Sequence, residues 1–116
     1  MNNKIQTWLI AIRPKTLPAA IAPVIIGLSY AYFQEILNPI VAFFTLFASL
    51  LIQIGTNLAN DVFDFEKGTD TEERLGPKRV TQAGLLTPKQ VKMGMLYTFI
   101  LALLIGCYLA WIGGLP

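Results

Sequence analysis

Residues 57–70 read Asn57-Leu58-Ala59-Asn60-Asp61-Val62-Phe63-Asp64-Phe65-Glu66-Lys67-Gly68-Thr69-Asp70, and this acidic, amide-rich stretch decides the fold. It follows directly on residues 39–59, a segment that carries no charged side chain. An apolar segment of about that length is typical of a helix that spans a membrane. The first carboxylates therefore stand where a spanning helix would reach the water.

The acidic side chains of this stretch converge on one side of the predicted helix. Because a helix advances about 100° per residue, Asn57, Asp61 and Asp64 share a face. Asn60 lies beside them, about a sixth of a turn away. Oxygen ligands suit a hard cation such as Mg²⁺, which proteins usually hold with one or two carboxylates and substrate phosphates. The pattern predicts a site for a magnesium-diphosphate group.

The alternative interpretation of these acids is a solvated helix end followed by an acidic loop. Against it, like charges at helical spacing repel one another unless something neutralises them, and no base alternates with the acids on this face. An EF-hand does not fit either, since counting back from Gly68 puts Phe63 where the first aspartate of that loop must stand. A cation site is the favoured interpretation.

Composition excludes several other classes of protein. Of the 116 residues, 54% are hydrophobic and only 14% are charged, which is too apolar for an ordinary soluble domain. The single cysteine, Cys107, rules out a disulfide framework within the chain. There is no histidine, so histidine-ligated haem, histidine-zinc sites and histidine general bases are excluded. The composition predicts a membrane protein.

Three apolar segments have spanning length, namely residues 16–33, 39–60 and 93–112. About twenty residues cross a hydrocarbon core ~30 Å thick. Pro18 and Pro23 interrupt the first segment and predict a kink, because proline removes a backbone donor. The predicted fold class is all-α, a multi-pass bundle of transmembrane helices. We interpret residues 1–116 as the N-terminal part of a single larger domain.

The basic residues indicate how the chain is oriented. All nine lysines and arginines fall before the first span or between the second and third, whereas residues 34–38 hold none. The positive-inside rule therefore predicts a cytoplasmic N-terminus and a cytoplasmic loop over residues 65–91. The protein is expected in the cell (inner or plasma) membrane, with the acidic stretch facing the cytoplasm.

The predicted loop is too long for a simple connector, and such loops are often lids or binding loops. Within it, Arg79 could clamp a phosphate with two parallel hydrogen bonds, while Lys78 would act as a point charge. These bases could equally be topology signals or contacts to anionic lipid. Near the end of the loop, Thr87 is a plausible N-cap and Pro88 a first helical residue.

The motifs resemble those of the UbiA superfamily of intramembrane prenyltransferases. Asn60, Asp61 and Asp64, with Asn57 one turn earlier, look like the first aspartate-rich motif of that superfamily. Residues 8–27, 57–70 and 76–85 are similar to the branch that prenylates 1,4-dihydroxy-2-naphthoate in menaquinone synthesis. The superfamily often has a further aspartate where this chain has Gly68, so Glu66 or Asp70 would have to supply that oxygen.

The resemblance implies an Mg²⁺-dependent enzyme that transfers a polyprenyl group from a polyprenyl diphosphate to the naphthoate, with loss of CO₂, giving demethylmenaquinone. The implied metal ligands are Asn57, Asn60, Asp61, Asp64 and Asp70. The implied substrate-binding residues are Asn57, Asn60, Lys78, Arg79, Arg13 and Lys15. The implied catalytic residues are Asp61, Asp64 and Arg79. Arg13 and Lys15 would attract the carboxylate of the acceptor, or would serve only as topology anchors.

The resemblance implies a bundle of about nine helices, with a second aspartate-rich motif in the later half. The remaining helices of the parent protein are therefore expected partners, and the 116 residues alone are expected to be inactive. Three alternatives stay open: another aromatic prenyltransferase of the same superfamily, a cation-binding transporter fragment, and a small membrane-anchored interaction module. A transporter would place its acids near the bilayer midplane. No nucleic-acid partner is expected.

Overall fold

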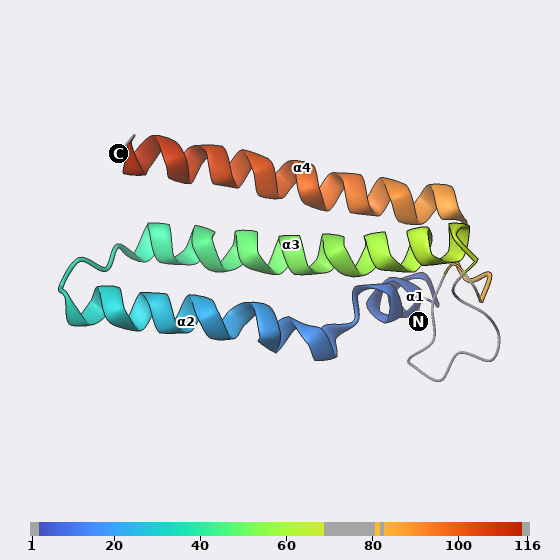
Figure 1. The fold of residues 1–116 in the computed structure, drawn as a ribbon, viewed down its shortest axis with the longest axis horizontal. Helices are drawn as coiled ribbons and strands as arrows, with labels where there is room; N and C mark the ends of the chain where they lie inside the picture. Colours follow the sequence, from blue (N-terminus) through green and yellow to red (C-terminus); the bar gives the residue numbers. More distant parts are fainter. Residues whose placement is uncertain (1–2, 69–80, 82, 115–116) are drawn as a thin grey trace.

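The computed structural model describes residues 3–68, 81 and 83–114, and all its regular elements are helices. A short helix, α1 (Asn3–Ile12), is followed by a 3-10 turn, η1 (Pro14–Thr16). Three long helices follow: α2 (Leu17–Phe33), α3 (Pro39–Glu66) and α4 (Pro88–Gly113). The long helices lie side by side with α3 in the middle, and α1 sits beside the C-terminal end of α3 (Figure 1).

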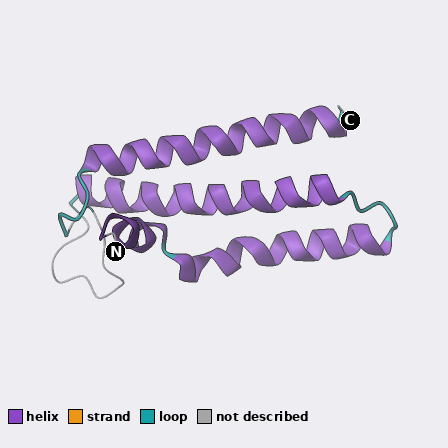
Figure 2. Ribbon diagram, turned by 180° about the vertical axis from the view of Figure 1, so that it is seen from behind, coloured by secondary structure: helices purple, strands orange, loops and turns teal. Residues whose placement is uncertain are grey.

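The long helices confirm the prediction of an all-α membrane fold. Three helical stretches, Lys4–Phe33, Pro39–Glu66 and Pro88–Gly113, are long and apolar enough to cross a membrane. No strand occurs among the residues that the structure describes, and Figure 2 shows only helices joined by short loops there. Most large apolar side chains on the outer surfaces remain exposed, as expected where lipid or further helices cover them.

The chain turns sharply between α1 and α2. Arg13 adopts a left-handed conformation with φ 57°. It precedes Pro14, whose ring disfavours the α-helical region for the residue before it, so α1 ends at Ile12. The hydroxyl of Thr16 donates to the Arg13 carbonyl over 2.9 Å and closes the turn. The separate helix α1 was not predicted from the sequence.

The two prolines of α2 do not act alike. Pro18 falls in the first turn of the helix, where its missing N–H would have had no intrahelical partner, so the prediction that Pro18 kinks the helix was wrong. Pro23 lies inside the helix and does interrupt the hydrogen-bond ladder. In the same region the hydroxyl of Ser49 on α3 donates to the carbonyl of Ala20 over 3.0 Å, which ties the two helices together.

The acidic end of α3 is helical beyond the predicted end of the span at residue 60. Residues 61–66 continue the helix because glycine and proline are absent until Gly68, whose φ of 75° ends it. The fourth helix starts at Pro88, the residue predicted from the sequence as its first helical residue. The predicted N-cap is confirmed, since Thr87 and Gln90 form a reciprocal capping box. The helices α3 and α4 are therefore separated by residues 67–87.

Two apolar clusters hold the helices together. The first consists of Ala11, Leu58, Val62, Leu86 and Val91, and it joins α1, α3 and the start of α4. The second lies between α3 and the later part of α4 and consists of Leu51, Ala102 and Ile105. Leu58 and Val62 of the first cluster adjoin Asn57 and Asp61 in the sequence, so this cluster fixes the position of the polar end of α3.

Candidate functional site

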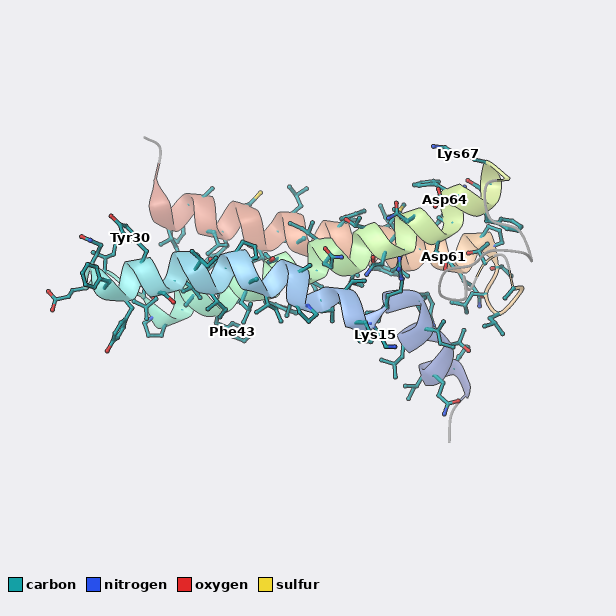
Figure 3. The ribbon with its side chains drawn as sticks, turned by 60° about the horizontal axis from the view of Figure 1, so that its bottom comes forward. Lys15, Tyr30, Phe43, Asp61, Asp64 and Lys67 are labelled. Atoms are coloured by element: carbon teal, nitrogen blue, oxygen red, sulfur yellow. The ribbon has the colours of Figure 1, made fainter. Side chains whose placement is uncertain are left out.

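The polar site is built on the last turns of α3. Asp61 is 2% exposed and Asn57 is 3% exposed, Asp64 is half-buried, and Asn60 is exposed. Asp61 and Asp64 come from the same end of α3, and Lys67 lies at its tip (Figure 3). A carboxylate as deeply buried as Asp61 is rarely found without polar partners, because removing its charge from water is unfavourable. The structure supplies some of those partners.

Asn57 joins α3 to the turn between α1 and α2. Its side-chain nitrogen donates to the carbonyl oxygen of Ile12 over 2.8 Å and to the hydroxyl oxygen of Thr16 over 2.7 Å. Because the Ile12 carbonyl can only accept, the atom of the Asn57 amide that faces Ile12 and Thr16 must be the nitrogen and not the oxygen. A cation would therefore have to be bound through the side-chain oxygen of Asn57.

Asp61 is held by a residue far along the chain. The backbone N–H of Thr81 donates to Oδ1 of Asp61 over 2.8 Å, and both residues are buried. A backbone donor fixes the orientation of the carboxylate, and a charge-assisted hydrogen bond of this kind is stronger than one between neutral groups. Thr81 falls within residues 76–85, one of the stretches that carry the resemblance, but no role was predicted for it from the sequence. No local signal in the sequence pairs it with Asp61.

Glu66 lies at the end of α3 and contacts α4. Its Oε2 is 2.7 Å from the Lys92 Nζ, and the same ammonium group lies 5.9 Å from the centroid of the Phe63 ring. The two charged side chains are 39% and 44% exposed, so the ion pair adds little stability. Glu66 had been one candidate for the extra oxygen ligand, and in the structure its carboxylate is paired with Lys92.

The two basic residues of the first turn differ in exposure. Arg13 is half-buried, whereas Lys15 is exposed and lies at the turn between α1 and α2 (Figure 3). The next residue, Thr16, accepts a hydrogen bond from Asn57, which lies four residues before Asp61 on α3. The connection between α1 and α2 is therefore attached to α3 close to Asp61. The structure thus brings the turn bearing Arg13 and Lys15 close to the acidic helix. Asp70, Lys78 and Arg79 lie outside the described residues.

The described residues can be tested for their fit to Mg²⁺. Within residues 3–68, 81 and 83–114, no group of three or more histidine, cysteine, aspartate or glutamate side chains is placed to hold a metal by itself. Asp61 and Asp64, one turn apart, still provide two carboxylates at one end of α3. Two carboxylates fit a magnesium ion that takes its other ligands from water and substrate phosphates. They do not fit an ion enclosed entirely by protein.

These features define an all-helical membrane protein with a buried carboxylate at one end of its central helix. The chain belongs to the UbiA prenyltransferase family, whose model matches residues 20–115.

Curated relatives carry a more specific name. The chain is 41% identical over 104 residues to a 1,4-dihydroxy-2-naphthoate octaprenyltransferase of Escherichia coli, covering 90% of this chain and 34% of the relative. Proteins of the same name from Haemophilus influenzae and Bacillus subtilis are 37% and 35% identical, covering 94% and 84% of this chain and 36% and 31% of the relatives. The chain thus spans about a third of the length of these relatives. No solved structure matches it.

Proposed function

We propose that this chain is the N-terminal part of a membrane enzyme that transfers a polyprenyl group from an isoprenoid diphosphate to an aromatic acceptor. The observation that carries the proposal is the buried carboxylate of Asp61, with Asp64 one turn further on, at the end of a helix long enough to span a membrane. Membership of the UbiA prenyltransferase family supports it. The name that several relatives share makes 1,4-dihydroxy-2-naphthoate the proposed acceptor.

The acidic end of α3 is proposed to bind the diphosphate through Mg²⁺. Asp61 and Asp64 would hold the metal, and the side-chain oxygens of Asn57 and Asn60 would add ligands, with Asp70 as a further candidate. When bound, Mg²⁺ would offset the negative charge that develops on the leaving diphosphate. The hydrogen bond from Thr81 keeps the Asp61 carboxylate in one orientation, which a preorganised site requires.

Arg79 and Lys78 are proposed to bind the phosphate oxygens directly. The planar guanidinium of Arg79 can donate two parallel hydrogen bonds to one phosphate, and Lys78 can contribute a positive charge. Both would act on the diphosphate as the allylic C–O bond breaks and the electron pair leaves with the oxygen. Since the residues lie outside the described part of the chain, this assignment rests on the sequence motif.

The isoprenoid tail requires an apolar path away from the acidic residues. A groove of about 350 Å³ runs along α2 and α3, with Leu109 of α4 also lining it. Its other lining residues are Ala20, Pro23, Thr45, Ala48, Ser49, Ile52 and Gln53. Gln53 is one turn before Asn57, so the groove begins close to the acidic end. Each CH₂ buried there would contribute about 0.8 kcal/mol to binding.

The acceptor is proposed to enter beside the turn between α1 and α2. Arg13 and Lys15 would attract its carboxylate. After the allylic C–O bond breaks, the electron-rich ring of the acceptor would form the new C–C bond and its carboxylate would leave as CO₂. The electron pair of the broken bond to CO₂ would return to the ring, so the product would be the prenylated hydroquinone, the reduced form of demethylmenaquinone. The hydrogen bonds of Asn57 to Ile12 and Thr16 hold this turn against the acidic helix, so donor and acceptor would meet at one end of the bundle.

The placement of the acids favours this proposal over a cation transporter. Asp61 and Asp64 lie in the last two turns of α3, and they are not near the middle of its 28 residues. Transporters usually bind their cations near the bilayer midplane, whereas the charged diphosphate headgroup of an isoprenoid donor would lie at the boundary between membrane and water. With the bases proposed to face the cytoplasm, the site would lie on the cytoplasmic side of the cell membrane.

The proposal is tested with the full-length protein in lipid nanodiscs. Labelled polyprenyl diphosphate and 1,4-dihydroxy-2-naphthoate are incubated with Mg²⁺ or with EDTA, and products are separated by chromatography. We expect a prenylated, decarboxylated product only with Mg²⁺. Transfer to a different aromatic acid but not to the naphthoate would assign another acceptor. Absence of transfer to every acceptor, by protein that is folded and contains its remaining helices, would contradict the proposal.

A further inference from the structure

The buried residue whose chemistry is still unexplained is Thr81. It is 3% exposed, and its backbone N–H donates to Asp61. Its side-chain oxygen, Oγ1, is buried. Among the residues that the structure describes, it is the buried side-chain polar atom that lacks a hydrogen-bond partner. Buried polar atoms are nearly always hydrogen-bonded, so an unpaired hydroxyl next to a binding carboxylate needs a physical explanation.

Packing does not explain why a hydroxyl stands at this position. Valine has nearly the same shape as threonine and would fill the same space without a buried polar atom. A buried hydroxyl without a partner is destabilising, because it has given up its hydrogen bonds to water. The contact with Asp61 uses only the backbone N–H, which valine would also provide. The hydroxyl is therefore best explained by a ligand that is present when the protein works.

The position of the hydroxyl indicates the chemistry of that ligand. The backbone nitrogen of Thr81 is 2.8 Å from Oδ1 of Asp61, which is proposed to bind a cation. The ligand of the hydroxyl must therefore be able to bind beside a carboxylate and its cation. A neutral hydroxyl can donate to an anionic oxygen, and hydrogen bonds to charged acceptors are the stronger ones. A phosphate group that binds together with a divalent cation would meet both conditions.

We propose that Thr81 is a binding residue for the donor, whose hydroxyl donates to a diphosphate oxygen while its backbone N–H positions the carboxylate of Asp61. The inference rests on the proposed function and adds to it a residue that links the two components of the metal-diphosphate group. The side chain of Thr81 would contact the diphosphate, and its backbone N–H holds Asp61, the proposed metal ligand. The hydroxyl thereby selects for a phosphate-bearing donor.

The test compares Thr81→Val with Thr81→Ser in the full-length protein. Thr98→Val is the matched control, since the Thr98 hydroxyl donates within its own helix, to the carbonyl of Met95 over 2.8 Å. Binding of a non-hydrolysable farnesyl thiodiphosphate is measured by calorimetry with MgCl₂, and the thermal midpoint is measured without ligand. Steady-state kinetics are recorded with donor and acceptor varied separately.

We expect Thr81→Val to weaken magnesium-dependent binding of the probe by about 10- to 100-fold, because it removes one hydrogen bond to a charged group. The KM for the donor should rise and the KM for the acceptor should stay near wild type. The ligand-free thermal midpoint should be unchanged or higher, since the variant loses an unpaired buried hydroxyl. Thr81→Ser should retain most of the binding, and Thr98→Val should bind like wild type.

Two results would overturn the inference while leaving the proposed function intact. In one, wild type and Thr81→Val bind the probe equally well. In the other, ligand-free Thr81→Val unfolds at a lower temperature than Thr98→Val, which would show that another part of the full-length protein pairs with the hydroxyl. If wild type itself fails to bind the probe with Mg²⁺, the proposed function is contradicted and the role of Thr81 falls with it.

Discussion

The side-chain amide of Asn57 donates a hydrogen bond of 2.8 Å to the carbonyl oxygen of Ile12. The acceptor is the last residue of α1 and the donor lies on α3, so one bond fixes the N-terminal helix against the acidic helix. The sequence pattern had assigned Asn57 to metal and substrate. The structure adds a separate role for its side-chain nitrogen, which joins α3 to the turn after α1. This structural role can be measured by stability, and the proposed binding role by activity.

Replacing Asn57 by alanine should lower both stability and activity. The carbonyl of Ile12 and the hydroxyl of Thr16 would lose their shared donor, which should reduce the free energy of unfolding by about 1–3 kcal/mol. Asn57→Asp should not restore stability, because a carboxylate cannot donate to a carbonyl. Thermal unfolding of the full-length protein in detergent measures the effect. Asn60→Ala is the control: Asn60 is exposed, so its loss should reduce activity without destabilising the fold.

Asp61 and Asp64 should be needed for the reaction and not for the fold. Asn replaces Asp with nearly the same shape, and at position 61 its side-chain oxygen can still accept from the N–H of Thr81. Membrane insertion and the thermal midpoint of Asp61→Asn and Asp64→Asn should therefore stay close to wild type. Prenyl transfer should fall by orders of magnitude, because stabilisation of the developing charge is lost. Wild-type turnover in the double variant, or full activity in EDTA, would disprove the metal site.

Arg79 should differ from Lys78 in its response to a conservative exchange. Arg79→Lys keeps the charge and the topology signal but loses the planar fork that binds one phosphate twice. Catalytic efficiency with the donor varied should fall about 10- to 100-fold, corresponding to roughly 1.5–3 kcal/mol. Lys78→Arg should have a small effect. Should both variants match wild type, these bases would be assigned to membrane orientation or lipid contact.

Gly55 should resist any larger side chain, because α3 and α4 meet there. A Cβ atom added at Gly55 would lie 2.6 Å from Cε1 of the Phe99 ring. Gly55→Ala is therefore expected to destabilise the protein by about 1–3 kcal/mol through overpacking. A double-mutant cycle with Phe99→Leu measures the contact, since the smaller side chain should recover part of the loss. Additive effects of the two changes would show that the helices separate freely at this point.

The two ends of α3 should be accessible from opposite sides of the membrane. Ile36, in the turn before α3, is 70% exposed, and Lys67 lies exposed at the other end, about 42 Å away along a helix of 28 residues. In a Cys107→Ser background, an impermeant thiol reagent applied outside intact cells should label Ile36→Cys and leave Lys67→Cys unmodified. Labelling in the reverse pattern would invert the proposed orientation and move the site to the outside.

Local features of the sequence were sufficient for the helices themselves. The uncharged run before Asn57 predicts a spanning helix, and the structure has one from Pro39. Thr87, Pro88 and Gln90 form the start of α4 as their residue types favour. These predictions succeed because apolar periodicity and capping depend on residues within about one or two turns of each other. The helix α3 continues to Glu66, six residues beyond the predicted end of the span, since the appearance of charge marks the membrane boundary and not the end of the helix.

The sequence by itself determined that this is a helical membrane protein with carboxylates gathered at one end of a spanning helix, because hydropathy and helical spacing are properties of neighbouring residues. Only the tertiary structure decided how those carboxylates are held. Asn57 bonds to Ile12, 45 residues away, and Asp61 accepts from Thr81, 20 residues away. Such pairs arise from the way α1, α3 and α4 pack around Leu58 and Val62, and that packing is a property of the assembled helices.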